Sequence, residues 1–137
     1  MSQLLITRRE FQRAYRNHFQ AYLQWTECKI RVTQSRLLLL FYAAECGLKA
    51  IWLKEHRLEN SMADPNFYSY GHDINKLLSD LRADLRLPTG FRTLSKNSRD
   101  VRTEQLNQAW RYGCELKDEL PIEDQLRIVC DWVGREL

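Results

Sequence analysis

Residues 36–45 read Arg-Leu-Leu-Leu-Leu-Phe-Tyr-Ala-Ala-Glu, a stretch that is apolar on nearly every face of a helix. Such a helix is covered by other helices, either at the centre of a bundle or in an oligomer interface. Glycine and proline, which interrupt helices, number only 5 and 3 among 137 residues. The stretch therefore predicts an all-α fold around one central helix, which we expect to run to about Arg57.

The sequence on either side of this helix predicts a single domain over residues 1–137, an up-and-down bundle of about five helices. Thr7 and Glu10 form a capping-box pattern, and Asp73 is placed to cap a later helix. Residues 58–71 and 89–99 are expected to be loops. The five helices are expected at about residues 8–31, 36–57, 73–87 and 100–112, and from Pro121 onward.

Cysteine usage and hydropathy favour a cytoplasmic protein. No CxxC pair and no zinc-ligand spacing occurs among the four cysteines, so free thiols in a reducing compartment are expected. These cysteines are Cys28, Cys46, Cys114 and Cys130. The longest apolar run, residues 37–44, is far shorter than the roughly 20 residues of a membrane span. We therefore expect no membrane segment, and no motif suggests a metal or cofactor.

Charge is unevenly distributed, although the net charge is only +3. Residues 1–36 carry 7 Lys or Arg against 2 Asp or Glu, and residues 86–111 carry 6 against 2. Residues 112–137 carry 3 against 7. If the two basic segments share a face, that face attracts phosphates. The alternative is that they form solvated faces that pair with the acidic C-terminal segment.

Three segments carry a recognisable pattern. Residues 42–52 read Tyr-Ala-Ala-Glu-Cys-Gly-Leu-Lys-Ala-Ile-Trp, residues 71–78 read Gly-His-Asp-Ile-Asn-Lys-Leu-Leu, and residues 109–112 read Ala-Trp-Arg-Tyr. A Glu-x-x-x-Lys-Ala helix, a Gly-His-Asp helix opening and an Arg-Tyr pair, in this order, resemble a HEPN domain. The resemblance covers about residues 8–135.

This resemblance implies a helical bundle that is usually a homodimer. Many HEPN domains cut RNA without metal in toxin–antitoxin, CRISPR or phage-defence systems, whereas others bind nucleotides or accompany a nucleotidyltransferase. The active members carry an Arg, then four to six residues, then a His, late in the bundle. Here no His follows Arg99, Arg102 or Arg111, and the one literal match, Arg13 to His18, lies on the first helix. The resemblance therefore implies a domain without the usual ribonuclease site.

The central helix also carries charged candidates for a site. Its polar and aromatic residues form one stripe: Tyr42, Glu45, Lys49, Trp52 and His56. Glu45 and Lys49 stand four residues apart in the favourable order for an ion pair. They are candidates either for lining a cleft that binds a nucleotide or nucleic acid, or for a purely structural pair. A buried carboxylate needs partners, and Arg111 is a candidate to join Glu45.

Three later residues are weak candidates for a catalytic role. His72 could act as an acid–base group, although it could equally brace the start of its helix. Arg111 and Tyr112 could bind a phosphate and stack on a base. The alternative for these two residues is closure of the bundle by a salt bridge and packing.

The basic loop supplies the remaining candidates. Lys96, Arg99 and Arg102 lie on or beside it, where contacts with nucleic-acid phosphates are expected. The alternative is that these three residues are loop charges that contact only water.

The leading interpretation is a cytoplasmic HEPN-like homodimer that binds RNA or a nucleotide in a bacterial defence or toxin–antitoxin system. A protein partner, such as a nucleotidyltransferase or an antitoxin, is compatible with it. One rival is an active metal-independent ribonuclease with an atypical site, formed by Arg111 with Tyr112, Arg102 or His72. The other rival is a non-catalytic scaffold module of a larger complex.

Overall fold

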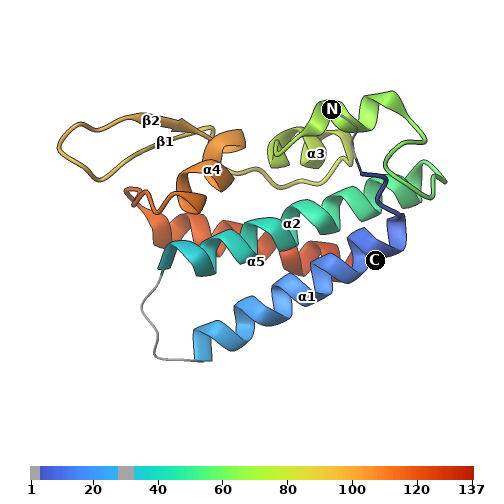
Figure 1. Cartoon of the computed structure of the whole chain (residues 1–137), viewed down its shortest axis with the longest axis horizontal. Coiled ribbons are helices and arrows are strands. Elements are labelled where there is room, and N and C mark those ends of the chain that lie inside the picture. The colour runs from blue at the N-terminus through green and yellow to red at the C-terminus, as the bar shows by residue number, and fades with distance from the viewer. Residues whose placement is uncertain (1–3, 28–32) are drawn as a thin grey trace.

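The computed structural model describes residues 4–27 and 33–137, which form a mostly helical domain with one small hairpin (Figure 1). The predicted helical fold is confirmed. The α-helices are α1 (Arg8–Glu27), α2 (Thr33–Glu55), α3 (Ile74–Asp80), α4 (Leu106–Arg111) and α5 (Glu119–Glu136). The other elements are the 3-10 helices η1 (Pro65–Tyr70) and η2 (Thr103–Gln105) and the strands β1 (Gly90–Arg92) and β2 (Asp100–Arg102).

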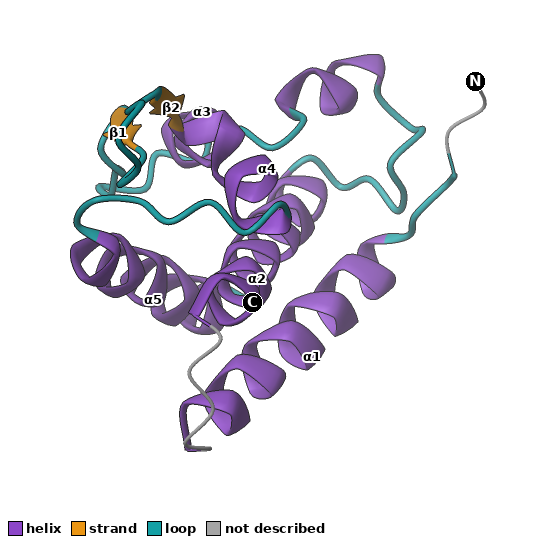
Figure 2. Cartoon of the chain, turned by 60° about the vertical axis from the view of Figure 1, so that its left-hand side comes forward, coloured by secondary structure: helices purple, strands orange, loops and turns teal. Residues whose placement is uncertain are grey.

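Helix α2 occupies the centre of the domain, as its apolar sequence predicts. It packs against α1, α3, α4 and α5, and Leu40, Phe41 and Leu48 are completely buried. Helix α1 lies on one side of α2, while α4 and the β1–β2 hairpin lie on the other (Figures 1 and 2). Of the two explanations for an all-apolar helix, burial within one chain is therefore the one that the structure shows.

The three long helices do not simply alternate in direction, because α5 runs parallel to α2. Arg36, near the start of α2, pairs with Glu123, near the start of α5, at 2.8 Å. Lys54, at the end of α2, donates a hydrogen bond to the carbonyl of Glu136 at 3.1 Å. The intervening chain carries α3, the hairpin and α4 back to the starting end of α2.

A buried carboxylate joins the three long helices at one end. Glu123 is only 6% exposed, and its Oε2 accepts a 2.6 Å hydrogen bond from the Tyr22 hydroxyl besides the ion pair with Arg36. Burial and the bond to Glu123 raise the pKa of Tyr22 above its ordinary value. The carboxylate is tolerated in the core because a cation and a hydroxyl replace its water.

Several element boundaries differ from those predicted. Helix α3 ends at Asp80 rather than before Pro88, because Arg82 takes a left-handed conformation (φ 58°) that turns the chain out of the helix. The predicted loop 58–71 contains η1. Helices α2 and α5 each begin two or three residues earlier than expected. The predicted end of the first helix, within residues 28–32, lies outside the described residues.

The largest difference is the β1–β2 hairpin, which replaces the predicted loop at 89–99 and the first turn of the predicted helix at 100–112. The strands are antiparallel, with Phe91 opposite Val101 and Arg92 opposite Asp100. Both Phe91 and Val101 are buried. This pairing ties residues 100–102 into extended chain, so α4 begins only at Leu106.

Gly47 allows α5 to approach α2 closely, and its replacement by alanine tests this contact. A Cβ at Gly47 would lie 2.5 Å from Cγ1 of Val133. Alanine is the better helix former by about 1 kcal/mol, but overpacking costs about 1–3 kcal/mol. We expect Gly47→Ala to lower the free energy of unfolding by about 1 kcal/mol in urea denaturation followed by circular dichroism.

The matched control places the same change in a Val133→Ala background, where the clashing methyl groups are absent. There only the 3.0 Å contact with Cδ1 of Tyr15 remains, so Gly47→Ala should destabilise less than in the unmodified protein. Equal destabilisation in both backgrounds would show that the Val133 contact is not the cause.

Candidate functional site

The structure brings His72 to Glu45 and Lys49, which the sequence suggested as a pair. His72 Nδ1 lies 2.6 Å from Oε1 of Glu45, and Lys49 Nζ lies 3.5 Å from its Oε2. Glu45 is only 7% exposed, whereas the His72 side chain is 46% exposed. A nearly buried carboxylate therefore holds a cation on one oxygen and a half-exposed imidazole on the other.

Local structure explains how His72 reaches Glu45. Asp73 caps α3, as predicted, with its Oδ1 accepting the Lys76 amide hydrogen at 3.1 Å. Gly71 has a positive φ of 52°, which turns the chain just before the cap. His72 stands between the two, outside the helix, and braces the start of α3 against α2. Its second ring nitrogen makes no hydrogen bond within residues 4–27 and 33–137, which leaves it able to exchange a proton with a bound group.

Arg111 does not join Glu45, contrary to the expectation from sequence. Its Nη2 donates a 2.9 Å hydrogen bond to the hydroxyl of Tyr42, one helical turn from Glu45 on α2. The His18 ring packs beside Tyr42, with 5.9 Å between ring centroids, and burial lowers the pKa of His18. Arg111 is therefore a cation next to the Glu45 cluster rather than part of it, and His18 faces Tyr42 while Arg13 is exposed.

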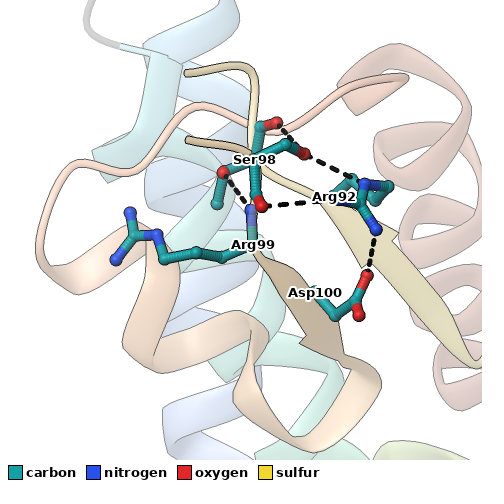
Figure 3. Close-up of polar contacts among 5 residues, drawn as sticks. Arg92, Ser98, Arg99 and Asp100 are labelled. Carbon is teal, nitrogen blue, oxygen red and sulfur yellow. Dashed lines mark hydrogen bonds and ion pairs between the residues drawn. The ribbon is translucent and has the colours of Figure 1, made fainter. Parts of the chain in front are cut away.

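The outer face of the hairpin carries cations that are already neutralised. Arg92 Nη1 pairs with Asp100 at 2.6 Å, and its Nε donates to the Ser98 hydroxyl at 3.0 Å (Figure 3). Arg102 Nε pairs with Glu104 at 2.9 Å. These two arginines are partnered by carboxylates of the hairpin and of η2.

Arg99 is placed differently. Side chains alternate along a strand, so Arg99 extends away from the Arg92–Asp100 pair (Figure 3). Its Nη2 lies 3.9 Å from Sγ of Cys114, and it makes no ion pair with any residue that the structure describes. Lys96 stands exposed in the connection between the strands and has no ion pair in the same range.

Arg99 and Tyr112 line a common hollow of about 280 Å³ between the hairpin and α4. Tyr112 is 72% exposed, so its ring is not used in the core. The alternative that Tyr112 packs in the bundle is therefore wrong, and a stacking role for its ring stays a prediction. Residues from both sides complete the lining: Thr93, Asp100, Val101, Gln105, Gln108, Ala109 and Cys114.

Sequence reasoning did not foresee Gln105, Gln108 or Cys114 at this hollow. They line it only because the hairpin folds over α4, and no local pattern signals that contact. The basic residues of α1 and those of the hairpin do not share a face, because α1 and the hairpin lie on opposite sides of α2, while residues 28–32 of the first basic segment lie outside the described residues (Figures 1 and 2).

Within residues 4–27 and 33–137, no group of three or more His, Cys, Asp or Glu side chains could hold a metal ion. No helix in these ranges combines the length and apolar character needed to cross a membrane. Cys46, Cys114 and Cys130 are free thiols, and Cys28 lies outside the described residues. Compared with protein-family models, curated proteins and solved structures, the chain matches none of them.

The Glu45–His72 contact predicts measurable energetic coupling. In a double-mutant cycle with Glu45→Gln and His72→Ala, we expect a coupling energy of about 1 kcal/mol, modest because His72 is half-exposed. Urea denaturation of the four proteins measures it.

The matched control repeats the cycle with Glu55→Gln in place of Glu45→Gln, since Glu55 is exposed on the same helix. The coupling energy from that cycle should be close to zero. A zero value for the Glu45 cycle as well would mean that the contact contributes nothing to stability.

Proposed function

We propose that the chain binds RNA through the β1–β2 hairpin and the adjoining end of α4. The observation that carries this proposal is the position of Arg99, a cation that no carboxylate of residues 4–27 and 33–137 pairs with and that shares a hollow with the exposed ring of Tyr112. Guanidinium groups bind phosphate oxygens through paired hydrogen bonds, and exposed aromatic rings stack on bases. Arg99 and Tyr112 are the pair of groups expected at an RNA-binding surface.

The rest of the hairpin supports this location. Lys96 adds a second unpaired cation at the exposed connection, where an RNA backbone has free access. The hairpin projects from the helical bundle on the side of α2 opposite α1 (Figure 1). Arg92 and Arg102 contribute less, because Asp100 and Glu104 already neutralise them.

The HEPN resemblance points to the same class of ligand and extends the proposal. HEPN-like domains bind RNA or nucleotides, which agrees with the groups at this surface. By the same resemblance we propose a homodimer, acting in a bacterial defence or toxin–antitoxin system. A nucleotidyltransferase or an antitoxin is the proposed protein partner.

The salt dependence of RNA binding tests the role of Arg99. Each phosphate contact on a single strand contributes about 0.7 to the slope of log K against log salt concentration. Arg99→Ala should weaken binding of a fluorescent oligoribonucleotide and reduce that slope by about 0.7. Fluorescence anisotropy over a salt series provides both values.

Arg9→Ala is the control, because Arg9 is exposed on α1, on the far side of α2 from the hairpin. It should leave the affinity and the slope nearly unchanged. Equal losses of affinity for both variants would show that binding arises from general electrostatic attraction rather than from a site at the hairpin. If the unmodified protein does not bind RNA, the proposed function is wrong.

A second candidate function, metal-independent ribonuclease activity, is favoured by the 2.6 Å contact between Glu45 and His72. A carboxylate on one ring nitrogen orients an imidazole so that the other nitrogen can accept a proton. On RNA, that nitrogen would take the proton of a 2′-hydroxyl, whose oxygen attacks the adjacent phosphorus. The phosphorus–5′-oxygen bond then breaks and the departing 5′-oxygen takes a proton from solvent water, which leaves a 2′,3′-cyclic phosphate and a 5′-hydroxyl. Lys49 and Arg111 are the nearby cations that would attract the phosphate.

Incubation with cellular RNA in EDTA distinguishes this candidate from simple binding. His72→Ala should abolish cleavage, and Glu45→Gln and Arg111→Ala should each reduce it. His56→Ala is the control, since His56 stacks on Trp52 elsewhere on the molecule. Undiminished cleavage by His72→Ala, or no cleavage by the unmodified protein, would rule out this site and leave the binding function.

A further inference from the structure

The surface around Tyr112 has two hollows rather than one. The hollow of about 280 Å³ opens toward α4, and a neighbouring hollow of about 450 Å³ opens toward the connection between β1 and β2. The two hollows share four of their lining residues: Thr93, Arg99, Tyr112 and Cys114. Arg99 and Tyr112 therefore stand between two adjacent depressions.

We infer that this surface is specific for single-stranded RNA, with an unpaired base stacked on Tyr112 in the hollow toward α4. The adjoining phosphate then lies on Arg99, and the strand continues into the second hollow. This inference rests on the proposed RNA binding and adds the class of strand and the contacts that select it.

The position of Tyr112 explains why an unpaired base is required. Tyr112 follows the last residue of α4, and Gly113, with a positive φ of 75°, turns the chain away directly after it. The ring is left exposed at the end of the helix. A base inside a duplex is covered on both faces by its neighbours, so only an unpaired base can place its face on this ring.

The polar lining of the hollow toward α4 fits the edge of a base. Gln105 uses its Oε1 to accept the Arg102 amide hydrogen at 3.0 Å, which leaves its amide hydrogens free. Gln108 is exposed on the same side of the hollow. Amide groups form hydrogen bonds with the edges of unpaired bases.

The charges around the two hollows favour one strand over two. Arg99 lies at the shared wall, and Lys96 lies in the connection beyond the second hollow. A duplex presents two backbones and needs cations over a broader face, but Arg92 and Arg102 are paired with carboxylates. Glu115 also lines the second hollow, so the strand has to enter it with a base or sugar rather than with a phosphate.

The test compares a fluorescent single-stranded oligoribonucleotide with a blunt RNA duplex of the same length, by anisotropy at one salt concentration. Tyr112→Ala should weaken single-strand binding about tenfold, the usual effect of removing one stacking ring, and should leave duplex binding unchanged. Tyr112→Phe keeps the ring and should restore the affinity. Tyr68→Ala is the matched control, because Tyr68 is another exposed tyrosine, on η1.

The outcomes separate this inference from the proposed function. If the unmodified protein binds both RNAs equally and Tyr112→Ala changes neither affinity, RNA binding stands and the single-strand site is overturned. An equal loss for single strand and duplex also overturns it. If the unmodified protein binds neither RNA, the proposed function fails and this inference fails with it. A selective single-strand loss that Tyr112→Phe repairs supports the inference.

Discussion

The burial of most of α2 is the constraint on which the rest of the structure depends, although Leu38, Leu39 and Tyr42 on one face are only partly buried. A largely apolar helix of 23 residues needs cover around most of its circumference, which one neighbouring helix cannot supply. Helix α1, which precedes α2 in the sequence, packs against it, and so does α5, the last helix of the chain. Because α5 runs parallel to α2, residues 56–118 must carry the chain back along the domain. The short helices α3 and α4 in this segment complete the packing around α2.

The candidate sites lie where this return segment contacts the middle of α2 or projects from the bundle. The start of α3 brings His72 to Glu45, and the end of α4 brings Arg111 to Tyr42. The hairpin holds Arg99 over the surface beside Tyr112. The long helices thus form a rigid support, and the chemistry is carried by the segment that connects them. This division is common in proteins, because connecting segments have exposed side chains and the support fixes their positions.

Interactions between residues close in sequence could be predicted, and those between distant residues could not. The Glu45–Lys49 pair and the Asp73 cap depend only on helix geometry, so spacing was enough to identify them. The sequence does not predict the hairpin, because strands of three residues carry almost no periodic signal. It makes Arg111 a candidate for Glu45 rather than for Tyr42, because both acceptors lie on one face of α2, one turn apart. Which side of the hairpin Arg99 lies on depends on how β1 and β2 pair, and that pairing is seen only in the folded chain.

The parallel arrangement of α2 and α5 also determines how this chain can fold. Helices α1 and α2 are adjacent in sequence, but the contacts that close the core span 101 residues from Tyr22 to Glu123 and 115 residues from Tyr15 to Cys130. Contacts at such separations form late, because a long loop must close first. During synthesis, one apolar side of α2 stays open until the α5 segment leaves the ribosome. The nascent chain is therefore most exposed to aggregation, and most dependent on chaperones, just before its last helix appears.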